Sequence, residues 1–299
     1  MDIDINRIYD RMPEEMQSSA QRWFYVLHPR RSWAQRIRPE TAHDAFVDRF
    51  FDDEAEFERY QREFFESSLP EHITGEIDAI DDEYDVYDAH RDECLKYYAL
   101  VRKFQPGTIV ETGVYSGVST TTILAALAEN GHGHLRSIDC SAGLRAGETD
   151  PEHRARQRQF SRDRPSCAEP TSHILPPGKE PGWLIPDHLR DRWTLTQGSS
   201  RTELPAVVAD TASIDLFFHD SAHTLSRMLF EFECVWDVLE PGGLIVSNHA
   251  DWNDAVDTFA EEHRCEHGDL SFHYLGYRET EEPIPCRTAY IRKPGGESA

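Results

Sequence analysis

The chain has 299 residues, enough for one sizeable core and a smaller appendage. Its formal net charge of −24 would repel phosphates, which excludes nucleic acid as a partner. No apolar run is long enough to span a membrane, and the N-terminus lacks the pattern of a signal peptide. We therefore predict a cytoplasmic protein without a membrane span.

The basic residues are nearly all arginine, since lysine occurs only at positions 96, 103, 179 and 293. An acidic, lysine-poor surface is typical of proteins in molar salt, where screening reduces self-repulsion, so we predict a halophilic source. The cysteines form no CxxC pair and no cluster with histidine, which argues against a structural zinc site and favours reduced thiols. They are Cys94, Cys140, Cys167, Cys234, Cys265 and Cys286.

Residues 1–104 form an acidic segment with aromatic residues at helical spacing. We predict a helical segment that covers the substrate or forms an oligomer contact. Residues 76–93 are expected to be a linker into a last helix over 93–104, which ends at Gln105-Pro106-Gly107.

From residue 105 onward, short β-rich runs alternate with helical patterns, which is typical of βαβ units and a parallel sheet. Two strand-like runs joined only by a loop close the chain and predict an antiparallel hairpin at the sheet edge. The expected strands are 108–113, 134–140, 193–198, 214–220, 244–248, 270–279 and 287–294. The expected helices are 118–130, 222–240 and 254–264.

Residues 141–181 interrupt this alternation with a stretch rich in Pro, Arg and Ser. The stretch is much longer than the usual connection of about 4–6 residues. It is either a lid over the site or a disordered insertion, and its low apolar content favours the second.

The first βα junction reads Glu111-Thr112-Gly113-Val114-Tyr115-Ser116-Gly117. In open α/β sheets the ligand lies at the carboxyl ends of the strands, beside the switch point. Dinucleotide turns usually read GxGxxG, whereas this turn reads ExGxxxG. Gly113 and Gly117 would let a ligand approach the backbone, and Glu111 would tolerate an amino group or sulfonium better than a pyrophosphate. Alternatively, the glycines only permit a tight turn.

Asp139 ends the second predicted strand, where a carboxylate can accept hydrogen bonds from ribose hydroxyls. This position alone does not distinguish a nucleoside cofactor from NAD. Together with the ExGxxxG turn, it favours S-adenosylmethionine.

The chain resembles the class I S-adenosylmethionine-dependent methyltransferases over about residues 105–293, within the macrocin O-methyltransferase-like branch, which has many archaeal members. The resemblance is carried by VETGVYSGVSTTTIL (110–124), GWLIPDHLRDRWTLTQGSS (182–200) and IDLFFHDSAHTLSRMLFEFECVWDVLEPGGLIVSN (214–248). It implies a doubly wound, Rossmann-like sheet of seven strands with an antiparallel last strand, in a domain spanning 105–299.

The resemblance also implies a cofactor site. Asp139 would hold the ribose, and Gly198 and Ser199 would lie near the adenine. Asp220, after the fourth strand, is where the family has an Asp followed three residues later by a His. The residues that would border the methionine part are Glu111, Gly113, Tyr115, Gly117 and Ser119.

Asp220 could bind a divalent ion or orient the substrate, and His223 could take a proton from an attacking hydroxyl. After the fifth strand the sequence departs from the family, because Asn248 and His249 replace residues that hold Mg²⁺ in relatives. Magnesium prefers hard oxygen ligands, so we expect no tightly held Mg²⁺. The metal candidates are Asp220, Asn248 and His249. With Asp251, His249 and Asp220 could suit a softer metal, or act without one.

We predict methyl transfer to an oxygen nucleophile, with His223, Asp220 and His249 as candidate catalytic residues. The resemblance suggests a glycan hydroxyl or a uronic acid carboxylate, or another small molecule, as the acceptor. Two alternatives stay open: an inactive binding or regulatory module, motivated by Asn248-His249, and an NAD-dependent oxidoreductase. Exposed aromatic residues on the N-terminal helices would indicate a homodimer.

Overall fold

The computed structural model describes residues 39–80, 92–140, 175–176, 178–275 and 284–295. The predicted lid or disordered insertion over 141–181 lies outside the described residues except at 175–176 and 178–181, and the first 38 residues also lie outside them. Of the described residues, none belongs to a helix long and apolar enough to cross a membrane.

Seven strands form one sheet in the order β3-β2-β1-β4-β5-β7-β6. The first five are parallel, and β7 runs antiparallel to both β5 and β6. The predicted doubly wound sheet with an antiparallel last strand is therefore confirmed, as is the terminal hairpin. The strands are β1 (Thr108–Thr112), β2 (His134–Asp139), β3 (Trp193–Gln197), β4 (Ile214–His219), β5 (Leu239–Ser247), β6 (Glu266–Leu275) and β7 (Ile284–Arg292).

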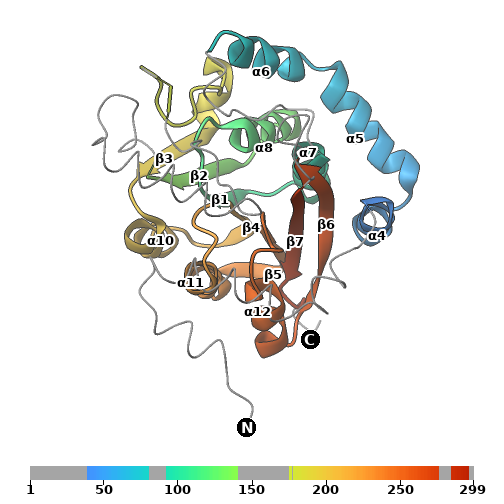
Figure 1. Ribbon diagram of the computed structural model, residues 1–299, viewed down its shortest axis with the longest axis vertical. Helices are drawn as coiled ribbons and strands as arrows, with labels where there is room; N and C mark the ends of the chain where they lie inside the picture. Colours follow the sequence, from blue (N-terminus) through green and yellow to red (C-terminus); the bar gives the residue numbers. More distant parts are fainter. Residues whose placement is uncertain (1–38, 81–91, 141–174, 177, 276–283, 296–299) are drawn as a thin grey trace.

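Helices cover both faces of this sheet (Figure 1). One face carries α8 (Val118–Asn130), the short 3-10 helix η3 (Asp187–Arg192) and the helices that precede β1. The other carries α10 (Ser200–Ala209), α11 (Leu225–Trp236) and α12 (Ala255–His263). Neighbouring residues of a strand enter opposite cores: Ile109 packs with the α8 side and Val110 with the α11 side. This alternation explains why both faces of the parallel strands are apolar.

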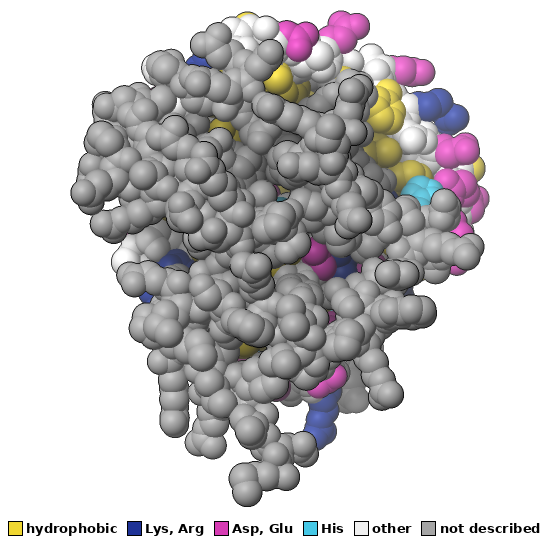
Figure 2. All heavy atoms as spheres, viewed as in Figure 1, with side chains coloured by type: hydrophobic (Ala, Val, Ile, Leu, Met, Phe, Trp, Pro, Cys, Tyr) yellow, Lys and Arg dark blue, Asp and Glu magenta, His cyan; other side chains and the backbone are white. Residues whose placement is uncertain are grey.

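The helices before β1 are α4 (Pro39–Phe50), α5 (Glu54–Glu66), α6 (Leu69–Asp78) and α7 (Asp92–Phe104). They share one apolar core with the sheet, where Phe50 packs edge-on against Tyr290 of β7 with ring centroids 4.9 Å apart. Glu54, Glu58 and Glu66 are exposed, and Figure 2 shows acidic side chains on the outer surface around α5. Most aromatic side chains of α4 and α5 thus pack inward in this shared core, and Phe65 is the one large apolar side chain that is exposed among the described residues.

Several boundaries differ from the sequence expectation, and β6 and β7 begin four and three residues earlier than expected, at Glu266 and Ile284. The predicted linker over 76–93 overlaps the helices on both sides, because α6 continues to Asp78 and α7 begins at Asp92. Helix α11 covers only 225–236 of the expected 222–240. Strand β5 begins at Leu239, so Pro241-Gly242-Gly243 lies within it. The backbone explains this extension, since Gly242 donates to the Lys293 carbonyl and Lys293 donates to that of Gly243.

Candidate functional site

The carboxyl ends of β1 and β4 meet at the switch point of the sheet, because the chain leaves β1 toward β2 on one side and continues through β4 and β5 on the other. The Asp220 N–H donates to the Thr112 carbonyl at 2.8 Å, and Asn248 N–H donates to the His219 carbonyl at 3.0 Å. Gly113 has φ of 89°, and a Cβ there would lie 1.9 Å from the Asp220 carbonyl oxygen. Gly113 is therefore required for close contact between the two strand ends.

Asp220, His223 and His249 converge at this edge, and one donor atom from each lies within 4.8 Å of the others. His223 Nε2 is 3.5 Å from Asp220 Oδ1, and the Asp220 side chain is 37% exposed whereas His223 is buried. The ring centroids of His223 and His249 are 4.7 Å apart, and both rings contact Trp252. The predicted catalytic trio is thus brought together around one accessible carboxylate.

Two features of this trio are typical of functional sites. His249 has φ of 48°, a left-handed backbone that a side chain rarely adopts. Desolvation alone would raise the pKa of Asp220, but its hydrogen bond and charge interaction with His223, followed by the charge of His249, hold that pKa well below its usual range. Asp220 is therefore an anion at neutral pH.

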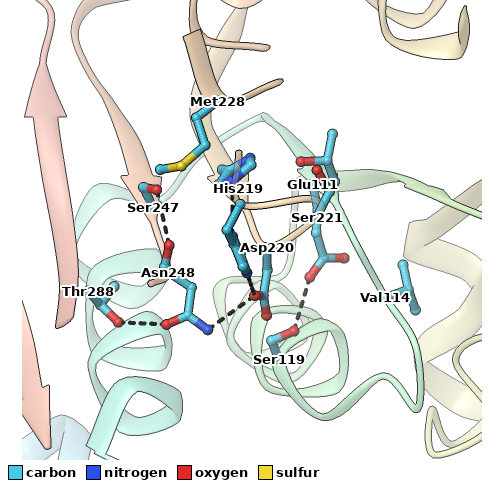
Figure 3. A network of polar contacts seen from close by, with 12 residues as sticks. Glu111, Val114, Ser119, His219, Asp220, Ser221, Met228, Ser247, Asn248 and Thr288 are labelled. Atoms are coloured by element: carbon cyan, nitrogen blue, oxygen red, sulfur yellow. Dashed lines mark hydrogen bonds and ion pairs between the residues drawn. The ribbon is translucent and has the colours of Figure 1, made fainter. Parts of the chain in front are cut away.

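Asn248 orients Asp220 (Figure 3). Its Nδ2 donates to Asp220 Oδ1 at 3.1 Å, and its Oδ1 accepts from Thr288 Oγ1 at 3.1 Å. Thr288 belongs to β7, so the antiparallel strand fixes the carboxylate through this amide. The sequence named Asn248 as a candidate metal ligand, whereas the structure directs its side chain toward two protein partners.

Among the described His, Cys, Asp and Glu residues, Asp220, His223 and His249 form a group whose donor atoms could hold a metal ion. One carboxylate with two imidazoles differs from the all-oxygen set that Mg²⁺ prefers. Asp251, which the sequence analysis considered with them, does not belong to this group, and its Oδ1 accepts from the backbone N–H of Arg287 at 2.9 Å. Burial raises the pKa of Asp251 to about 6.

Two residues that the sequence analysis did not single out, His219 and Glu231, extend this site inward. His219 Nδ1 is 2.7 Å from Glu231 Oε2, and His219 Nε2 is 3.3 Å from His223 Nδ1. Both side chains are fully buried. One signal was available: Glu231 lies three residues after Met228 and four before Val235, on the apolar face of α11, where a carboxylate needs partners.

Tyr97 of α7 also lies near Asp220. Burial and then the Asp220 charge raise the pKa of Tyr97 well above its ordinary value, while its hydrogen bond with Thr288 acts in the opposite direction. Helix α7 was assigned from sequence to the N-terminal segment, yet it contributes this side chain beside the site.

Glu111 is buried at the carboxyl end of β1, where hydroxyl groups surround it. Its carboxylate accepts from Ser137 at 2.7 Å, Thr120 at 2.9 Å and Ser119 at 3.2 Å. Burial nevertheless raises the pKa of Glu111 to about 7. The expected cofactor residues Glu111 and Ser119 therefore contact each other, and the carboxylate that was expected to face a ligand organises the turn.

Asp139 is buried at the end of β2 and holds the same turn from the other side. Its Oδ2 accepts from the backbone N–H groups of Val114 at 2.6 Å and Tyr115 at 2.9 Å. Tyr115 has φ of 49°, so the turn is held in an uncommon backbone conformation. The structure thus places Asp139 and Tyr115 together beside Gly113.

The open side of Gly117 faces another segment of the chain. Gly182 N–H donates to the Tyr115 carbonyl at 2.8 Å, and Leu184 N–H donates to that of Ser116 at 3.1 Å. A Cβ on Gly117 would lie 2.8 Å from Gly182 Cα. Gly117 is therefore required for packing of residues 182–184 onto the turn.

Gly198 and Ser199 lie at the end of β3, where Ser199 caps α10 and accepts from Arg201 N–H. Arg227 of α11 donates to the hydroxyls of Ser199 and Ser200 at 3.0 Å each. These residues share the carboxyl edge with Asp139, since Gly198 N–H donates to the Asp139 carbonyl at 2.9 Å. All expected cofactor residues thus lie along one edge of the sheet.

Comparison with solved structures finds methyltransferases of low sequence identity. The O-methyltransferase from Bacillus cereus in complex with SAH is 14% identical with a TM-score of 0.43, over 84% of this chain and 99% of that one. The O-methyltransferase TomG from Streptomyces achromogenes, involved in tomaymycin synthesis and in complex with SAM, is 15% identical with a TM-score of 0.41, over 86% and 99%. These values support no assignment of ligand or activity to this chain.

No curated protein matches the chain. A family model described as a methyltransferase domain matches residues 110–249, just under half of the 299 residues. The matched stretch runs from within β1 to His249, and so includes the turn, Asp139, Asp220 and the histidines of the site. The region that carries the candidate site is therefore similar to a methyltransferase domain.

Proposed function

We propose that the protein is a class I S-adenosylmethionine-dependent methyltransferase that methylates an oxygen atom. The observation that carries the proposal is the arrangement along the carboxyl edge, where the turn held by Asp139 lies directly beside Asp220 and its two histidines. The family match over residues 110–249 supports the same activity. The macrocin-like branch, the halophilic source and the cytoplasmic location remain predictions.

The residues of the carboxyl edge fit a nucleoside cofactor with a cationic sulfonium. Asp139 offers a carboxylate at the end of β2 for the ribose, and Asp220, whose backbone carbonyl lies beside Gly113, offers an anionic side chain at the end of β4. Gly198 and Ser199 would lie near the adenine. When bound, S-adenosylmethionine would supply an electrophilic methyl group. The chain's contribution would be alignment of the acceptor, which can lower a barrier by about 7–11 kcal/mol when two reactants are held in attack geometry.

His223 is the residue that we assign to proton removal. Its Nε2 lies on the Asp220 side of the ring, and its other nitrogen contacts His219. Asp220 is exposed enough to contact an acceptor hydroxyl, and its negative charge would stabilise the imidazolium that forms. His249 would complete the wall of the site with Trp252. A glycan hydroxyl or a uronic acid carboxylate is the proposed acceptor class.

An inactive binding module of the same fold would bind S-adenosylmethionine but would not transfer its methyl group. The test is transfer of a labelled methyl group from S-adenosylmethionine to a panel of sugars, uronic acids and small-molecule hydroxyls. We expect methylated product from the wild type, and a rate lower by about 10²–10⁴-fold in His223→Gln, the usual contribution of a general base.

The control is His132→Gln, because His132 is exposed, lies away from the carboxyl edge, and its ring nitrogens contact the backbone carbonyls of Asn130 and Gln105. Equal rates for the wild type and His223→Gln would contradict the role of His223. Cofactor binding with no product from any acceptor would favour the inactive module.

A further inference from the structure

We propose that helix α6 supports the turn at residues 113–117, and that His72 is the positioning residue through which it does so. This inference rests on the proposed function, because it takes the turn as part of the cofactor site. The observation is a connecting segment, residues 182–184, which is hydrogen-bonded to α6 on one side and to the turn on the other (Figure 1).

The turn contains a residue that needs support from several sides. Tyr115 has φ of 49°, a left-handed backbone conformation that is costly for a residue with a side chain and persists where other contacts fix it. Its N–H donates to Asp139 Oδ2 at 2.9 Å, and its carbonyl accepts from Gly182 N–H at 2.8 Å. One backbone group of Tyr115 is therefore held by the end of β2, and the other by the connecting segment.

The connecting segment is itself firmly placed. Its second bond to the turn runs from Leu184 N–H to the Ser116 carbonyl at 3.1 Å. The Gly182 carbonyl accepts from Arg190 Nη2 of η3 at 2.9 Å. Leu184 is also buried in the core that the sheet shares with the N-terminal helices. Any movement of Leu184 would thus reach the turn directly.

His72 holds the remaining backbone group of Leu184. Its Nε2 lies 2.9 Å from the Leu184 carbonyl oxygen, and Nε2 is the donor because a carbonyl can only accept. Leu184 is therefore bonded to α6 through its carbonyl and to the turn through its N–H.

A second contact joins the same parts of the chain. Lys179 Nζ lies 3.6 Å from Glu76 Oε2 of α6 and 4.2 Å from the centre of the Trp183 ring. Both charged side chains are partly exposed, so water and salt weaken this ion pair. The hydrogen bond of His72 is therefore the contact to test.

A role in packing alone would end at α6. Loss of the His72 donor would then loosen α6 and residues 182–184 but leave the turn unchanged. The positioning role predicts that the loss reaches the turn, where the N–H groups of Val114 and Tyr115 donate to Asp139. Exchange of these amide hydrogens with solvent distinguishes the two roles, because it reports local opening of the backbone.

The experiment is hydrogen–deuterium exchange of the free protein, followed on peptides that cover the turn, α6 and β4. His72→Phe keeps a ring and removes the donor, whereas His72→Gln keeps a donor N–H on a side chain of similar reach. Exchange in the turn should be about two- to tenfold faster in His72→Phe, the factor that corresponds to one hydrogen bond, and close to the wild-type rate in His72→Gln. Exchange in β4 should not change in either variant.

Glu71→Gln is the matched control, because Glu71 is exposed on the same helix, and it should leave all three peptides unchanged. His72→Asn, whose amide is too short to reach the carbonyl, replaces His72→Phe if that variant does not fold, with the same expected result. Faster exchange confined to α6 and residues 182–184 would overturn the proposal. Faster exchange in β4 as well would also overturn it, since that would indicate a loss of global stability.

The consequence for the cofactor is measured by calorimetric titration with S-adenosylhomocysteine. Its dissociation constant should rise in His72→Phe by about the same two- to tenfold factor and return to the wild-type value in His72→Gln. An unchanged dissociation constant in a variant whose turn exchanges faster would contradict the link between α6 and the cofactor. Exchange is measured on the free protein, so failure of S-adenosylhomocysteine to bind the wild type would refute the proposed function and not the support of the turn by α6.

Discussion

Glu111 and Glu231 are both buried carboxyl groups, but their pKa values are displaced in opposite directions. Burial raises the pKa of Glu111 from 4.5 to about 7, so ionising it in the folded protein costs about 3 kcal/mol. This group stabilises the fold most below pH 4.5, and its contribution is lost as the pH rises through 7. Replacing Glu111 with Gln removes the titration. The unfolding free energy of Glu111→Gln should therefore rise relative to that of the wild type by about 2–3 kcal/mol between pH 5 and pH 8.

The assay is urea unfolding of both proteins at several pH values, with the free-energy difference plotted against pH. Glu231→Gln is the matched control. Because the pKa of Glu231 is lowered to about 2, that carboxyl is ionised in the folded state across this range, and its variant should differ from the wild type by a nearly constant amount. A difference between wild type and Glu111→Gln that does not change from pH 5 to pH 8 would refute the reasoning.

Two further predictions follow from the strand ends. Gly113→Ala should lower the free energy of unfolding, measured by urea unfolding, by much more than the control Gly131→Ala. Both glycines have positive φ, which costs about 1–2 kcal/mol for alanine. Of the two, Gly113 is the one where the added Cβ would collide with backbone atoms. Equal losses would show that the turn can move away from Asp220. Millimolar Mg²⁺ should leave the melting temperature unchanged, because the neighbours of Asp220 are Asn248, His223 and His249 and include no second carboxylate. A clear rise in the melting temperature would show that the site binds Mg²⁺ all the same.

The sequence predicted the sheet well because each parallel strand is a short apolar run followed by a polar residue at the same edge. Asp139 and Asp220 could be placed beside the first turn from topology alone, since parallel strands align their carboxyl ends. The extent of β5 was not predictable in this way. Pro241-Gly242-Gly243 reads as a turn, and only its pairing with Lys293, far along the chain, makes it part of a strand.

The roles within the site were harder to predict than their positions. Asn248 was compared with metal-binding residues of relatives, but its partner Thr288 comes from β7, and such a contact has no local signal. Gly113 and Gly117 were recognised as necessary, yet each is required by another protein segment. Glu231 was overlooked because it lies inside an otherwise ordinary amphipathic helix, and its importance depends on His219 lying opposite in β4.

The central claim is that the carboxyl edge binds S-adenosylmethionine. The most direct test is calorimetric titration with S-adenosylhomocysteine in high salt, using the wild type, Asp139→Ala and Asp215→Ala. Asp215 is a matched control, because its carboxylate also accepts from two backbone N–H groups, at Gly107 and Thr108, but at the opposite end of the sheet. Fluorescence titration with NADH is run in parallel.

We predict micromolar binding of S-adenosylhomocysteine to the wild type and Asp215→Ala, loss of binding in folded Asp139→Ala, and no tight binding of NADH. Absence of S-adenosylhomocysteine binding to the wild type, or tight binding of NADH, would contradict the account.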